Sequence, residues 1–260
     1  MRGVVSVVGL VAACGRLGFD LDVAHGSDGA PPGDGSPGGG DGPDAFVSTV
    51  CTGFICDDFE GATLDARWAI DTSAGSGELD TTHAHSGTQS VRLTTNAIAS
   101  STTDAYALLH TTMGLPYTGR LYARVWEYIP SPMPTTPIDQ IVDFSNFAGQ
   151  GISACARDGY YVDNDYTSTL YAESTTATVI LDAWFCIQLE IPSGTSGATY
   201  ISINGTQVAD LTLTKPTVQP QPQQVFIGTE WPGTIASQPA FDVWIDDVII
   251  STSPTTCEQE

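Results

Sequence analysis

In one short segment of the chain, every second side chain is of a type that could bind a ligand. Four aromatic or basic residues share one side of the segment 119–129: Tyr122, Arg124, Trp126 and Tyr128. Because successive residues of a β-strand point to opposite faces, these four separate from the aliphatic residues between them. Aromatic rings stack on sugar rings, and arginine hydrogen-bonds hydroxyls or pairs with uronate carboxylates. The segment therefore predicts a carbohydrate-binding face. The alternative is that the aromatic stripe is itself the core, with the aliphatic set under a loop.

Trp231 is a second candidate for contact with a sugar. It lies in Thr-Glu-Trp-Pro-Gly, residues 229–233, which is typical of a turn. A tryptophan in a turn could form the rim of a binding groove, or simply cover the edge of a sheet.

Oxygen-rich clusters raise the question of a bound cation. Asp57, Asp58 and Glu60 form one cluster, and Asp163-Asn164-Asp165 forms another. Calcium prefers such oxygen ligands, although no Asp-x-Asp-x-Asp-Gly loop is present. His83 and His85 would share a face if extended, but no third metal ligand lies nearby in the sequence, so a turn is the better interpretation.

The elements that must position these residues begin after residue 46. Residues 25–43 contain eight glycines and four prolines and no large apolar side chain, which predicts a disordered tether. Short alternating runs separated by turn residues follow, at 89–95, 119–129, 184–191 and 241–250. Asn204-Gly205 predicts a tight hairpin turn within 200–208. Many short strands predict one all-β sandwich or barrel domain over residues 47–260.

The start of the chain predicts export. Arg2 precedes a short apolar run that ends in Val11-Ala12-Ala13-Cys14. This pattern resembles the lipobox of bacterial lipoproteins, which implies a signal peptide at 1–13, a lipidated Cys14, and a tether over 14–46. Gly15 follows the cysteine in place of an inner-membrane aspartate, so the resemblance favours the outer membrane or cell surface. The expected partner there is the lipid bilayer, through acylated Cys14.

The charge of the chain excludes one class of partner. The full chain has a formal net charge of −22, with Lys215 as its single lysine. Phosphate backbones would repel such a chain, so nucleic-acid binding is not expected. The acidic residues are spread along the chain, which indicates mainly a solvated surface.

The strands resemble those of concanavalin A-like (laminin-G-like) jelly rolls. The likeness lies in residues 54–61 with Trp68, and in 85–93, 121–129, 184–190 and 243–250. It implies an all-β, antiparallel jelly-roll β-sandwich. Galactose-binding-like jelly rolls share similar opening and closing strands and are the main alternative. Both families often hold a structural calcium ion, and here Glu60 with Asp246 or Asp247 could bind it.

The resemblance implies a non-catalytic, lectin-like carbohydrate-binding domain. Glycoside hydrolases and polysaccharide lyases share the fold, so a degradative enzyme is the alternative, with Glu127, Glu190 and Arg124 as candidates. The Glu-x-Asp-x-x-Glu strand and the Gln-Ile-His motif of those enzymes are missing from the sequence. A structural or adhesive protein that binds other proteins is the third possibility.

Disulfides are expected in an exported chain. Cys155 and Cys186 both lie on polar faces of two probable neighbouring strands, so they are predicted to pair. Because the last strand of this fold runs beside the first, Cys257 could meet Cys51 or Cys56. Alternatively, Cys51 and Cys56 pair and Cys257 stays free.

Overall fold

The computed structural model describes residues 53–99, 105–134, 139–156, 159–166, 170–231, 237 and 239–257. The predicted signal peptide, Cys14, the tether over 14–46 and Cys51 lie outside these residues. Within the part of the chain that is described, no helix is long and apolar enough to cross a membrane.

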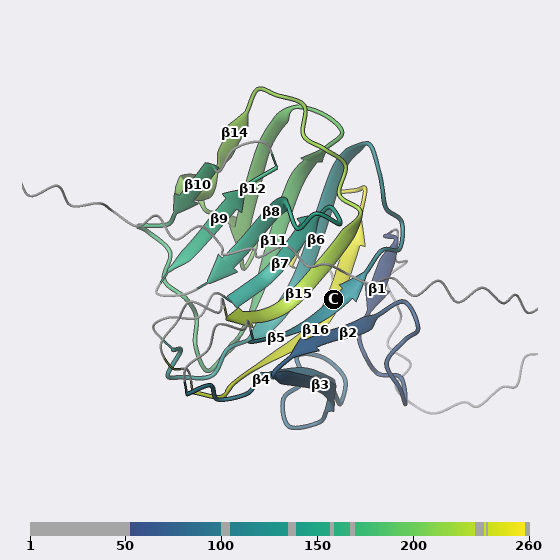
Figure 1. Ribbon diagram of the computed structural model, residues 1–260, viewed down its shortest axis with the longest axis vertical. Coiled ribbons are helices and arrows are strands. Elements are labelled where there is room, and N and C mark those ends of the chain that lie inside the picture. Colours follow the sequence, from purple (N-terminus) through teal and green to yellow (C-terminus); the bar gives the residue numbers. More distant parts are fainter. Residues whose placement is uncertain are drawn as a thin grey trace, which may run out of the picture.

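Two antiparallel sheets pack face to face, as the sequence predicts, and lie one over the other (Figure 1). Sheet A has nine strands in the order β13-β12-β11-β6-β16-β4-β3, with β1 beside β16 and β14 beside β12. Its strands are β1 (Ile55–Asp57), β3 (Gly75–Asp80), β4 (Ser90–Thr95), β6 (Gly119–Tyr128), β11 (Trp184–Ser193), β12 (Gly197–Ile203), β13 (Thr206–Gln207), β14 (Leu213–Lys215) and β16 (Phe241–Ser251).

Sheet B has seven strands in the order β10-β9-β8-β7-β15-β5-β2. Its strands are β2 (Ala69–Ser73), β5 (Ala105–Thr111), β7 (Asp139–Ser145), β8 (Gly151–Ala156), β9 (Tyr160–Asn164), β10 (Leu170–Glu173) and β15 (Gln224–Trp231). The helical turn η1 (Ala209–Leu211) precedes β14.

Alternation along the strands builds the core between the two sheets. On β6, Leu121, Ala123 and Val125 are buried in the main hydrophobic cluster, which confirms the predicted division of this strand into two faces. The hairpin between β12 and β13 is also confirmed: Asn204 and Gly205 have φ angles of 47° and 76°. Both values are those that a tight primed turn requires.

The first and last strands lie side by side, as the resemblance implied. Ile55 of β1 pairs with Ile250 of β16, and β16 also pairs with β4 and β6. The pairing of β16 with β6 is interrupted by a bulge between Asp246 and Ile249, where Asp247 has a φ of 46°. This bulge turns the two neighbouring carboxylates, Asp246 and Asp247, toward the loop that precedes β4.

The predicted pairing of Cys155 with Cys186 is wrong. Cys186 of β11 is bonded to Cys257, and Cys155 is a buried thiol on β8. Both residues do point away from the core, but β8 belongs to sheet B and β11 to sheet A, so they lie on opposite sides of the sandwich. Cys257 does not pair with Cys56 either, although Cys56 is itself disulfide-bonded.

Candidate functional site

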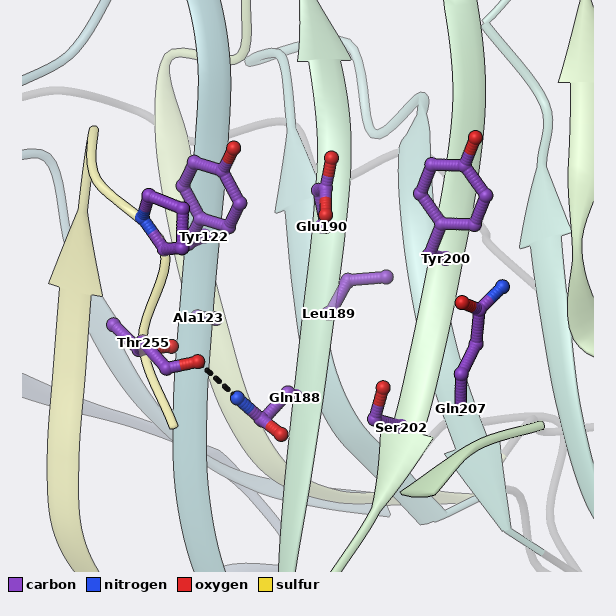
Figure 2. A pocket seen from close by; sticks show the side chains of 10 residues that line it. Tyr122, Ala123, Gln188, Leu189, Glu190, Tyr200, Ser202, Gln207 and Thr255 are labelled. Carbon is purple, nitrogen blue, oxygen red and sulfur yellow. Dashed lines mark hydrogen bonds between the residues drawn. The ribbon is translucent and has the colours of Figure 1, made fainter. Parts of the chain in front are cut away.

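The outer face of sheet A carries the predicted sugar-binding residues of β6. Tyr122, Trp126 and Tyr128 are half-buried there, while Arg124 is only 5 % exposed. Tyr122 lines a pocket together with residues of β11 and β12 (Figure 2). The other three residues lie under the loop 81–89 and the chain that follows β16.

Loop 81–89, between β3 and β4, covers Trp126 and Tyr128. The His85 ring stacks on Trp126, with centroids 3.6 Å apart and an interplanar angle of 16°. The His83 ring lies 4.3 Å from both Tyr128 and Trp244. This part of the stripe is therefore packed against the molecule's own histidines and does not line an open groove.

Arg124 holds the C-terminal segment against sheet A. Its guanidinium donates hydrogen bonds of 3.3 Å to the backbone carbonyl oxygens of Asp247 and Thr256. Trp231, which the sequence placed in a turn, is instead the last residue of β15 and pairs with Ala105 of β5. Glu127 faces the core and is fully buried, between Phe185 and Ile245 on the neighbouring strands.

The three predicted calcium ligands fasten loop 81–89. Glu60 accepts hydrogen bonds of 2.8 and 2.9 Å from the backbone amides of Thr88 and Gln89. Asp246 accepts one of 2.8 Å from the amide of His85, and Asp247 accepts one of 2.9 Å from the hydroxyl of Ser86. These carboxylates stabilise the loop that caps the aromatic stripe.

Burial and the neighbouring Asp247 carboxylate raise the pKa of Asp246 to about 8. A carboxyl group this far from water and beside a like charge keeps its proton at neutral pH. Among the described residues, no three His, Cys, Asp or Glu side chains gather as a metal-binding group. The calcium site stays a prediction.

The outer face of sheet B carries a polar and aromatic row that the sequence did not reveal. Register places six side chains in line across β5, β15, β7, β8, β9 and β10: His110, Phe226, Asp143, Ser153, Asp163 and Tyr171. The Ser153 hydroxyl donates a 2.9 Å hydrogen bond to Asp143, and both side chains are almost fully buried. The sequence predicts Asp163 only as a possible cation ligand, because nothing in it shows that β9 lies beside β8 in this row.

A pocket of about 300 Å³ opens at the β2–β5 side of this row. Three aromatic rings line it, with an acid and an amide beside them: Tyr106, Phe147, Phe226, Asp71 and Gln224. Phe147 is 52 % exposed, so its ring is accessible at the mouth of the cavity. We call this cavity the sheet B pocket.

Hydrogen bonds fix the turn that presents Phe147. The Asn146 side chain accepts bonds of 2.9 and 3.0 Å from the amides of Ala148 and Gln150, which closes the turn between β7 and β8. The Gln224 amide donates a 3.1 Å bond to the carbonyl of Asn146. These bonds fix the backbone of the turn from which the Phe147 ring extends.

His110 lies next to the pocket and is stacked on Phe226, with ring centroids 4.6 Å apart. Its Nδ1 is 3.4 Å from the Asp71 carboxylate. Burial lowers the pKa of His110, against the opposing effects of Asp71 and Gln224. The ring is therefore mainly neutral at pH 7, able both to donate and to accept a hydrogen bond.

Comparison with known proteins shows the fold of the chain but does not assign it to a family. No protein-family model and no curated protein sequence matches the chain. Among solved structures, it is similar to the cellulose-induced protein Cip1, with a TM-score of 0.63 and 19% identity over 78% of this chain and 99% of that one. An endo-β-1,4-glucuronan lyase from the fungus Trichoderma reesei gives a TM-score of 0.62 and 14% identity over 78% and 96%. The chain is a jelly-roll β-sandwich.

The binding domain of a botulinum neurotoxin, solved in complex with rat synaptotagmin II, is a more distant structural relative. Its TM-score is 0.54 at 12% identity, over 78% of this chain and 49% of that one. The jelly-roll fold therefore occurs in proteins of different activities, and activity must be argued from the side chains of this chain.

Proposed function

We propose that this protein binds polysaccharide without cleaving it, through the sheet B pocket. The observation that carries the proposal is the grouping of Tyr106, Phe147 and Phe226 around one cavity that also contains Asp71 and Gln224. Aromatic faces contact the apolar faces of sugar rings, while carboxylate and amide groups hydrogen-bond their hydroxyls. The structural likeness to Cip1 and to a glucuronan lyase supports a carbohydrate ligand.

The charge of sheet B favours a neutral polysaccharide. Its seven strands contain no lysine or arginine, and they carry Asp71, Asp143, Asp163 and Glu230 on the outer face or its pocket. Asp143, Asp163 and Glu230 are almost fully buried, whereas the Asp71 carboxylate is partly exposed at the pocket, where it would repel an anionic chain such as a polyuronate. Neutral glucans, mannans or xylans fit this face better than the glucuronan on which the structural relative acts.

The test measures binding of the full chain to an array of neutral glycans and, for comparison, anionic polyuronates. The chain carries Cys14→Ser to prevent acylation. We expect binding to a neutral class, weakened about tenfold by Phe147→Ala or Tyr106→Ala, because a buried aromatic contact contributes more than 1 kcal/mol. Met113→Ala is the matched control, since Met113 is another exposed apolar residue, outside the pocket. A lack of binding to every neutral glycan, or equal binding by all variants, would overturn the proposal.

A cleaving enzyme is the second candidate, favoured by the row Asp143, Ser153 and Asp163. Register places these residues opposite one another on β7, β8 and β9, so the two acids lie two strand spacings apart, about 10 Å between backbones. Two carboxylates on one face are what glycoside hydrolysis requires. If the protein releases new reducing ends from a bound glycan and Asp143→Asn abolishes this release, the protein is an enzyme and not only a binding protein.

We further propose that Cys14 anchors the protein in the bacterial outer membrane or at the cell surface. The support is the lipobox-like Val11-Ala12-Ala13-Cys14 and the glycine-rich composition of residues 25–43. Expressed in a bacterium with labelled palmitate, the native chain should incorporate label and fractionate with membranes. The Cys14→Ser chain should do neither. Label in both chains, or in neither, would contradict the anchor.

A further inference from the structure

A second pocket lies on the opposite side of the sandwich, on the outer face of sheet A. Its floor is a row of three side chains in register across β6, β11 and β12: Tyr122, Glu190 and Tyr200. Figure 2 shows the two phenol rings on either side of the carboxylate, with both hydroxyls pointing the same way. We call this the tyrosine pocket.

The charge of Glu190 is already balanced within the protein. The Arg120 guanidinium lies 3.1 Å from the Glu190 carboxylate and 5.5 Å from the centre of the Tyr200 ring. Arg120 also donates a hydrogen bond to the backbone carbonyl of Ala198, which fixes its position. A pocket with a paired acid and base prefers a neutral, hydrogen-bonding ligand to an ion of either sign.

Hydrogen-bonding groups continue along one side of the row. Gln188 and Ser202 extend from the neighbouring strands, and Gln207 extends from β13 (Figure 2). Burial raises the pKa of the Tyr122 phenol, and the Glu190 carboxylate adds to this effect. Tyr122 therefore keeps its hydroxyl proton, and the pocket presents both donors and acceptors between two aromatic rings.

The remaining wall is the segment that follows β16. Pro254 and Thr255 line the pocket, and the Gln188 amide donates a hydrogen bond to the carbonyl of Thr255. The Cys186–Cys257 disulfide ties this segment to β11, which lies under the pocket. The wall is thus covalently attached to the floor.

We propose that the tyrosine pocket binds one neutral sugar unit, independently of the sheet B pocket. Its volume of about 240 Å³ is below the roughly 300–1,000 Å³ of pockets for drug-sized ligands, so it suits a single ring. Two aromatic rings and a balanced array of hydroxyl, amide and carboxylate groups match the apolar faces and hydroxyls of such a ring. The two sites would let one molecule hold two glycan chains, one on each side of the sandwich.

The test uses the full chain with Cys14→Ser, titrated with glucose, galactose, mannose and N-acetylglucosamine and followed by ligand-observed NMR. We expect saturable binding of at least one of these sugars, weakened about tenfold by Tyr200→Ala and largely retained in Tyr200→Phe, which keeps the ring. Met113→Ala serves as the control for an unrelated substitution. Thermal unfolding of each variant shows whether the fold is intact.

Further variants separate this site from the one proposed on sheet B. Tyr106→Ala should leave binding of the monosaccharide unchanged, whereas Cys257→Ser should weaken it by releasing the wall. Conversely, Tyr200→Ala should leave polymer binding to the sheet B pocket in place. The tyrosine pocket is ruled out if none of the four sugars binds, or if Tyr200→Ala binds as the parent chain does. Loss of the bound sugar in Tyr106→Ala alone would assign it to sheet B instead.

Discussion

The imidazole of His85 lies flat on the indole of Trp126, with ring centroids 3.6 Å apart. The same imidazole is hydrogen-bonded to Asp247 over 2.6 Å, so a residue of the last strand holds the ring in place. The most prominent aromatic residue of the β6 stripe is therefore capped by a loop that the C-terminal strand fastens. Among the described residues of the β6 stripe, Tyr122 is the one that lines a pocket.

Replacement of His85 should uncover Trp126. We expect His85→Ala to lower the free energy of unfolding by about 1–3 kcal/mol, because it removes an aromatic stack and a hydrogen bond to a carboxylate. Tryptophan emission should shift to longer wavelength as water reaches the indole. Chemical denaturation followed by fluorescence measures both effects, with the exposed Thr63→Ala as control. Unchanged emission and an unchanged midpoint would show that the stack contributes nothing.

The Cys186–Cys257 disulfide should stabilise the whole domain. It closes a loop with a sequence separation of 71, and Cys257→Ser is expected to lower the free energy of unfolding by about 2–4 kcal/mol. Cys155→Ala is the matched control, because Cys155 is a buried thiol outside this bridge. Non-reducing peptide mapping should recover a peptide that joins Cys186 to Cys257. A peptide that joins Cys155 to Cys186 would contradict the structure.

Stability should fall as the pH rises from about 4 to about 8. The native pKa of Asp246 is about 8, against 3.8 for the ordinary carboxyl group, so in this range the native state keeps a proton that the unfolded chain has released. Each pH unit in this window costs up to about 1.4 kcal/mol, and the effect levels off above pH 8. Denaturation in EDTA at several pH values measures the slope. Asp246→Asn should flatten it, whereas the exposed Asp58→Asn should not. Equal slopes in both variants would assign the pH dependence to other groups.

The sequence predicts a structural calcium ion at Glu60, Asp246 and Asp247. Calcium should therefore raise the melting temperature at pH 8. At this pH a divalent cation would offset the repulsion between the two adjacent aspartates. The comparison is thermal unfolding in calcium and in EDTA, with Glu60→Gln as the variant that should lose the difference. Identical melting in both buffers would show that no calcium ion stabilises the fold at these residues.

Much of the fold could be predicted from local patterns. Alternation in residues 119–129 predicted which side chains of β6 face the core, because the side-chain period of a strand is two. Asn204-Gly205 predicted its hairpin, because few other pairs accept positive φ at both positions. These features depend on neighbouring residues alone, and the structure confirms them.

The candidate sites depend on pairing between distant segments. Phe226 reaches Asp143 and His110 only because β15 pairs with both β7 and β5, from which it is separated by a long stretch of chain. Glu190 meets Tyr122 and Tyr200 for the same reason, through β6 and β12. No local pattern in the sequence states which strands become neighbours, so the rows of side chains across sheets A and B could not be predicted.

The sequence by itself determined an acidic, all-β chain with a lipobox-like start and the inward and outward positions of its strands. Only the tertiary structure decided which outward positions are open. Cys155 and Cys186 both point outward, yet on different sheets, and Trp126 points outward under His85. The physical reason is that alternation within a strand specifies a face, whereas the exposure of that face depends on loops and strands that fold onto it from elsewhere in the chain.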